Sequence, residues 1–246
     1  MRLFRVVGDC ASVIALTDSV AVWQQQPVIV SRRQMLGALV GVAGIVATSS
    51  ALAEALGEMC LVTPEQTEGP YYPINDQLDK DNDLTLVNGQ TGRAEGQLLY
   101  VTGQVRDRKC RPIPGALVEI WQASARGRYH HPRDRSNSAP LDPFFQSWGQ
   151  TRTDGDGRYL FKTIKPASYA AGRNWIRPSH IHFKVRQPNS QEWTTQMYFA
   201  GDPHQDRDYI LNEVPAVERK RVIVEMQEPP RQYEPTSRLC RFDLIL

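Results

Sequence analysis

The segment YAAGRNWIRPSHIHFKV, residues 169–185, ends in a pattern that predicts a β-strand with one buried face. Apolar and polar residues alternate over HIHFKV, residues 180–185, as they do on a strand with one side in a core. His180 and His182 therefore project from the same face, and their imidazoles are aimed at one point. Such a pair is half of a metal site, although the spacing alone also fits a solvated strand face that carries two histidines.

Outward from this segment, short strand patterns recur between turn signals. Proline and glycine in Pro112–Gly115, and Asp-Gly pairs in Asp154–Gly157, mark two of the turns. Ala125–Asp156 is expected to be a long irregular insertion. Many short strands favour a sandwich or barrel, so we expect an all-β fold with a single β-sandwich domain and long loops. The expected strands are Leu98–Arg106, Ala116–Ser124, Gly157–Ile164, His180–Arg186, Trp193–Phe199, Arg221–Glu225 and Leu239–Ile245.

Residues 1–53 differ from the rest of the chain. The stretch SRRQML, residues 31–36, precedes a run of small apolar residues and then Ala51-Leu52-Ala53, which is the layout of a twin-arginine export signal. The run is shorter than the roughly 20 apolar residues that a membrane span needs, so no stable span is expected. A buried N-terminal helix is the alternative. We expect a signal and extension at 1–53, an N-terminal arm at 54–97, a sandwich at 98–246, and export to the periplasm.

Charge and cysteine usage narrow the classes of function and of metal site that the chain could have. Without residues 1–53 the chain has 25 Lys and Arg against 25 Asp and Glu, which gives no case for binding nucleic acid or an anionic membrane. Cys60, Cys110 and Cys240 remain, so one disulfide is compatible with an oxidising compartment, and the sequence does not tell which pair forms it. No CxxC spacing points to zinc or an iron–sulfur cluster.

Several motifs surround the histidine strand in a fixed order. They are GRYHHP at 127–132, DPFFQSWGQTRTDGDGRYLFKTIKP at 142–166, Tyr169, RPSHIHFKV at 177–185 and TQMYFAGDP at 195–203. This order and spacing resemble the intradiol ring-cleavage dioxygenases, and most closely the protocatechuate 3,4-dioxygenase subunits. The resemblance runs from about Thr63 to Pro203.

The resemblance implies one ferric ion per chain, held by Tyr129, Tyr169, His180 and His182. The chemistry of these side chains agrees with that ligand set. A free tyrosine ionises near pH 10, so a phenolate at pH 7 costs about 4 kcal/mol, which a hard trivalent cation supplies. Two phenolates and a hydroxide would also balance the three charges of the ion in a buried site.

The resemblance also implies which residues act on the substrate. Arg177, Tyr169 and Gln196 match catalytic positions, and Gly69, Pro70 and Tyr71 of the TPEQTEGPYY loop match residues that border the substrate. The implied reaction opens a catechol, protocatechuate or a related diol, between its two hydroxylated carbons with O2 to give a cis,cis-muconate. A homo-oligomer is left open.

Less specific interpretations of these residues remain alongside the resemblance. Arg177 also fits a surface ion pair, and Gln196 an exposed strand position. His130 and His131 are expected to be loop histidines in contact with water. For the whole chain, the alternative function is a secreted β-sandwich binding module that keeps the fold without catalysis.

Overall fold

The computed structural model describes residues 60–74, 79–187 and 192–246. All of them belong to one unit of the chain, Leu56–Leu246. The segment on which the export signal was predicted, residues 1–53, lies outside the described residues, as does the start of the predicted arm. Among the residues that are described, no helix has the length and apolar character to cross a bilayer.

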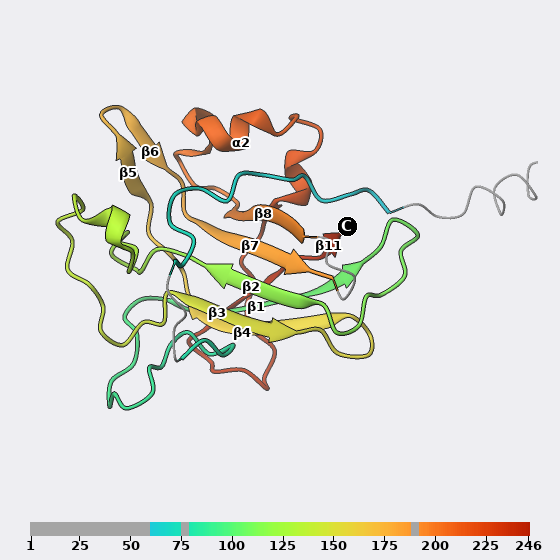
Figure 1. Ribbon diagram of the computed structural model, residues 1–246, viewed down its shortest axis with the longest axis horizontal. Helices are drawn as coiled ribbons and strands as arrows, with labels where there is room; N and C mark the ends of the chain where they lie inside the picture. The colour runs from blue at the N-terminus through green and yellow to red at the C-terminus, as the bar shows by residue number, and fades with distance from the viewer. Residues whose placement is uncertain (1–59, 75–78, 188–191) are drawn as a thin grey trace, which may run out of the picture. The chain divides into compact units, whose positions relative to one another are not determined.

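Two β-sheets dominate the described part of the chain (Figure 1). In the first, β1 (Leu98–Arg106) pairs antiparallel with β4 (Arg158–Ile164) on one side. On its other side β1 pairs parallel with β10 (Arg238–Arg241) and then with β11 (Leu244–Ile245). The second sheet has the order β3 (Trp148–Arg152), β2 (Leu117–Trp121), β7 (His180–Arg186), β8 (Glu192–Phe199) and β9 (Ile223–Val224).

The core lies between these sheets and confirms the predicted sandwich. Val101 and Phe161 from the first sheet and Ile181, Phe183 and Val185 from β7 belong to one buried cluster and have no exposed surface. Removing such a side chain from water stabilises the fold by about 1.5–3 kcal/mol. Because side chains alternate along a strand, burying this face of β7 sends its histidines to the opposite face of the second sheet.

Smaller elements lie outside the two sheets. β5 (Tyr169–Gly172) and β6 (Trp175–Arg177) form a separate two-stranded ribbon. Helix α2 (Tyr209–Glu213) follows β8 in the chain. The short 3-10 helices are Pro132–Asp134, Gln205–Arg207 and Arg219–Arg221.

The strands Leu98–Arg106 and His180–Arg186 have their predicted bounds, whereas other expectations need correction. The insertion Ala125–Asp156 is not wholly irregular, because β3 pairs with all five residues of β2. The predicted strand Leu239–Ile245 is interrupted where the Asp243 carboxylate accepts the Gln104 amide proton at 3.0 Å in place of a backbone carbonyl. In the predicted strand Arg221–Glu225 only β9 is a strand, because Arg221 ends a 3-10 helix and Val222 is a turn residue.

The segment Cys60–Tyr72, here called the arm, crosses the outer face of the second sheet (Figure 1). The backbone N–H of Gln66 donates to the Thr194 carbonyl at 2.9 Å. Glu68 forms an ion pair with Lys184, and the Tyr72 hydroxyl donates to Glu119 at 2.8 Å. These contacts fix the arm over the histidine face.

A disulfide joins Cys60 at the start of the arm to Cys110, and Cys240 is free and buried. It links residues 50 apart in the sequence, so replacing both by serine should lower the free energy of unfolding by about 2–4 kcal/mol, mainly by releasing the unfolded chain. Denaturant unfolding of wild type and the Cys60→Ser/Cys110→Ser variant measures this. Reductant should destabilise the wild type and leave the variant unchanged, and equal midpoints for the two proteins would contradict the prediction.

Candidate metal site

The two histidines of β7 sit at the centre of a row of site-facing side chains. His182 is in register with Trp121 of β2 on one side and Gln196 of β8 on the other. The Trp121 ring stacks on the His182 ring at 4.7 Å between centroids and 10° between planes. The Nε2 atoms of His180 and His182 are 3.2 Å apart, so both rings are held with these nitrogens facing one point.

The surroundings of His180 decide which of its nitrogens is free. Its Nδ1 lies 2.6 Å from the Pro178 carbonyl oxygen, which can only accept, so Nδ1 carries the proton and donates it. The Nε2 lone pair therefore points into the site. The 3.2 Å between the two Nε2 atoms is close enough for both histidines to hold one ion.

Tyr129 reaches this point from the loop after β2. Its backbone amide donates to Asp134 at 2.8 Å, and its hydroxyl lies 3.4 Å from His180 Nε2. Tyr169 arrives from the base of the β5–β6 ribbon. The two tyrosine rings meet edge to face at 5.5 Å between centroids. The structure thus brings together all four residues predicted as ligands, from three distant parts of the chain.

Burial makes the uncharged form of each group the stable one when no cation is present. It raises the pKa of Tyr169 to about 12 and that of Tyr129 well above 10. Burial, reinforced by the charge of Arg177, holds the pKa of His180 and His182 well below 6.5. Neutral imidazole is the form that binds metal, and the phenols need a strong positive charge to ionise.

The donor set itself narrows the choice of metal. Among the described residues no group of three or more His, Cys, Asp or Glu side chains is placed to hold an ion, whereas the two phenols lie beside the histidines. Two phenolate oxygens and two imidazole nitrogens suit a hard trivalent ion such as Fe(III) better than zinc, which favours cysteine, histidine and carboxylate. The residues present therefore fit ferric iron.

Acidification is expected to destabilise the metal-free protein through His180 and His182. The unfolded chain binds protons near pH 6.5, whereas the folded protein does not, because the folded pKa values are depressed. This contribution to stability is complete above pH 6.5 and is lost as the pH falls toward the folded pKa values. Between pH 6.5 and 5.5 the pair should lose about 2–3 kcal/mol, at about 1.4 kcal/mol per group and pH unit. Urea unfolding across this pH range measures the loss. If the free energy of unfolding of His180→Gln fell with pH as steeply as that of the wild type, the prediction would be contradicted.

Arg177 is not a surface residue, because only 3% of it is exposed. Its Nε donates to Asp208 at 2.9 Å and a terminal nitrogen donates to Gln196 Oε1 at 2.6 Å. Gln196 is fully buried, and its amide nitrogen donates to the Thr67 carbonyl at 2.9 Å. The surface interpretations of both residues are therefore wrong. Gln196 is placed to orient Arg177 and to anchor the arm.

The three predicted substrate-bordering residues lie on the arm beside the donor atoms. Gly69 has φ +72°, and a Cβ there would lie 3.5 Å from Cε1 of His182. Tyr71 stacks on Tyr129 at 4.5 Å between ring centroids. Pro70, which lies between Gly69 and Tyr71 in the sequence, is exposed. His131, expected to contact water, is instead 9% exposed with its ring edge-on to Tyr71, so that expectation is wrong, whereas His130 is exposed.

Sequence reasoning missed several residues that shape the site. The place of Trp121 beside His182 could not be read from the sequence, because its stacking on that ring depends on the strand register. Asp134 and Tyr198 were not singled out. Asp208 carried a usable signal, since an aspartate just before a short helical stretch is a typical N-cap.

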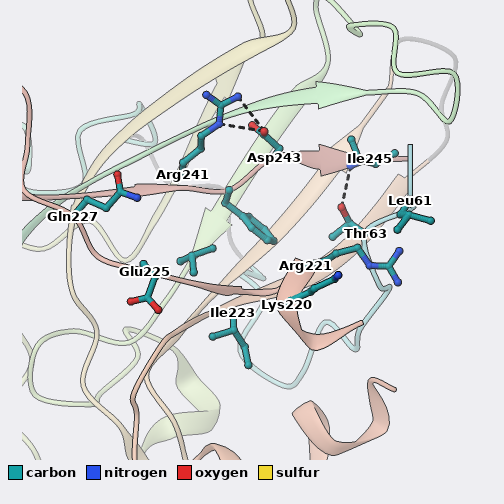
Figure 2. A pocket seen from close by; sticks show the side chains of 12 residues that line it. Leu61, Thr63, Lys220, Arg221, Ile223, Glu225, Gln227, Arg241, Asp243 and Ile245 are labelled. Carbon is teal, nitrogen blue, oxygen red and sulfur yellow. Dashed lines mark hydrogen bonds and ion pairs between the residues drawn. The ribbon is translucent and has the colours of Figure 1, made fainter. Parts of the chain in front are cut away.

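Two of the cavities formed by the described residues differ in how close they lie to the four candidate ligands. One of about 990 Å³ has Tyr129 and His131 in its wall together with apolar side chains such as Leu141 and Phe145. Another, of about 410 Å³, is shown in Figure 2 and lies between Thr63 and the C-terminal strands, where Arg241 pairs with Asp243. None of the four candidate ligands lines the second cavity.

Comparison with known proteins places the chain among dioxygenases. A family model described as "Dioxygenase" matches residues 67–246. A protocatechuate 3,4-dioxygenase beta chain from Burkholderia cepacia is 43% identical over 157 residues, which cover 63% of this chain and 66% of that protein. A catechol 1,2-dioxygenase 2 from Acinetobacter lwoffii is 32% identical over 181 residues, covering 65% and 61%. The chain thus spans less than two thirds of either relative.

A solved structure agrees. The dioxygenase domain of a dioxygenase carbohydrate-binding protein fusion from Streptomyces sp. SirexAA-E is 27% identical, with a TM-score of 0.54 over 75% of this chain and 97% of that domain.

Proposed function

Since the chain belongs to the intradiol ring-cleavage dioxygenase family, we propose that it is a ferric, non-haem enzyme that opens the ring of a catechol between its hydroxylated carbons. Dioxygen is the second substrate, and the product is a cis,cis-muconate. The observation that carries this proposal is the meeting of Tyr129, Tyr169, His180 and His182 at one buried point, with imidazole nitrogens 3.2 Å apart.

One ferric ion per chain would be held by the two histidine Nε2 atoms and the two tyrosine oxygens. When bound, it supplies the Lewis acidity that keeps both tyrosines ionised and activates a catechol for attack by dioxygen. The depressed pKa of both histidines leaves their lone pairs available at neutral pH. Tyr169 would hold the ion from the small ribbon outside both sheets.

Arg177 supplies a fixed positive charge next to the donors. Its guanidinium is held through two nitrogens, by Asp208 at Nε and by Gln196 at Nη2, so it does not have to reorient when negative charge develops on the substrate ring. The arm closes the site above His182 through Gly69 and Tyr71, which keeps bulk water from the reacting ring.

The relatives support a proposal for the preferred substrate. Protocatechuate is the first candidate because the similarity to a protocatechuate 3,4-dioxygenase beta chain, 43%, exceeds that to a catechol 1,2-dioxygenase, 32%. We further propose that the chain is exported through the twin-arginine pathway. The Cys60–Cys110 disulfide supports this, since such bonds persist in oxidising compartments.

The test is product analysis with iron-reconstituted protein. Protocatechuate, catechol and hydroxyquinol are each offered with O2, and iron per chain is quantified in the same sample. A muconate from at least one of them is the expected product. A semialdehyde product would mean that the bond next to the two hydroxylated carbons is cleaved, which would contradict the proposal. Iron-replete protein that consumes none of the three diols would refute it.

A further inference from the structure

Asp208 is a fully buried carboxylate that contacts neither the sheet histidines nor the tyrosines. It precedes helix α2, and its Oδ2 accepts the Leu211 amide proton at 3.1 Å. Its Oδ1 accepts two further hydrogen bonds, from Arg177 Nε at 2.9 Å and from Trp175 Nε1 at 3.0 Å. A helix cap needs only the first of these bonds, so the carboxylate does more than end a helix.

The two bonds to Oδ1 come from the strand that carries Arg177. Trp175 and Arg177 are the two ends of β6, and Arg177 pairs in register with Tyr169 of β5. The guanidinium lies over the Trp175 ring at 5.7 Å. Asp208 therefore ties both ends of β6 to helix α2 through one oxygen atom.

The contact between Arg177 and Asp208 joins two opposite charges in a buried environment. Arg177 and Asp208 form an ion pair with side chains 4% and 0% exposed. A buried guanidinium without its carboxylate is an uncompensated charge, and it moves or draws in water to reduce that cost. The other hydrogen-bond partners of Arg177, Gln196 Oε1 and the Tyr198 hydroxyl at 3.4 Å, are neutral acceptors at its Nη2. They cannot replace the carboxylate.

We propose that Asp208 is the positioning residue for Arg177 in the ring-cleavage reaction: it fixes the Nε edge of the guanidinium so that the charge faces the substrate. This inference rests on the proposed function. Asp208 acts through Arg177 and touches no reacting atom.

The variant Asp208→Asn separates positioning from capping, because asparagine is nearly the same size and is an equally good N-cap. We expect kcat to fall about 10- to 100-fold, as for other residues that orient a catalytic group, with little change in KM or iron content. Asp206→Asn, an exposed aspartate two residues earlier, is the matched control and should keep wild-type kcat.

A double-variant cycle with Arg177→Gln shows whether the effect passes through Arg177. In the Arg177→Gln background, Asp208→Asn should cause no further loss of kcat. In metal-free protein, the free energy of unfolding lost in the double variant should be smaller than the sum of the losses in the two single variants. An unchanged kcat in Asp208→Asn, or an equal loss in both backgrounds, would overturn the inference. If iron-loaded wild type cleaves no catechol, the proposed function and the kinetic role fail together. The metal-free unfolding cycle then still tests the pairing, and additive effects would refute it.

Discussion

Tyr129→Phe is expected to lower iron retention and to reduce turnover by more than about 100-fold. Loss of a residue that merely supports a metal ligand costs about 10- to 100-fold, and loss of a ligand should cost more. The substitution removes one oxygen and leaves the ring, which is 2% exposed, to keep its packing against Tyr71 and Tyr169. Iron per chain after reconstitution, the visible tyrosinate-to-iron charge-transfer band and kcat are the measurements.

Tyr72→Phe is the matched control for this experiment. Tyr72 belongs to the same aromatic cluster, but its hydroxyl donates to Glu119 at 2.8 Å and does not face the histidines. Its removal should cost about 1 kcal/mol of stability and leave the iron content and colour unchanged. A Tyr129→Phe protein with full iron, full colour and wild-type turnover would remove Tyr129 from the ligand set.

The features readable in the sequence are those set by local periodicity. The alternation in residues 180–185 correctly predicted that Ile181, Phe183 and Val185 face the core and that both histidines share the other face. It did not predict that the histidine face is buried as well. The same reasoning gave the bounds of β1 and the sandwich class. The grouping of Tyr129 and Tyr169 with the histidines came from the family resemblance, because no local pattern distinguishes these tyrosines from others.

The features that were missed depend on contacts between distant segments. β3 has no alternating pattern, since Trp148 and Gly149 are both buried, and it is a strand because β2 offers it a ladder. The β5–β6 ribbon begins with Tyr-Ala-Ala-Gly, a weak strand former, and depends on pairing and on the bonds from Trp175 and Arg177 to Asp208. The pairing of Cys60 with Cys110 follows from where the arm lies, which composition does not reveal.

Arg177→Lys is expected to reduce kcat by about 100- to 1000-fold while the iron content stays at the wild-type level. Losses of this size follow removal of one preorganised group that stabilises developing charge. Lysine keeps the positive charge but concentrates it at one nitrogen, so it cannot bond Asp208 and Gln196 through two nitrogens fixed in one plane. A loss in Arg177→Lys therefore reports the orientation of the charge.

Arg173→Lys makes the same chemical change at an exposed arginine in the turn of the same ribbon and should leave kcat unaltered. The loss in Arg177→Lys should appear in kcat more than in KM, because the interaction strengthens only as charge develops on the ring. Steady-state turnover measured over a range of substrate concentrations, from well below KM to saturation, separates kcat from KM. A raised KM with normal kcat would instead make Arg177 a ground-state binding residue, and its rigid contacts with Asp208 and Gln196 would then serve substrate affinity alone.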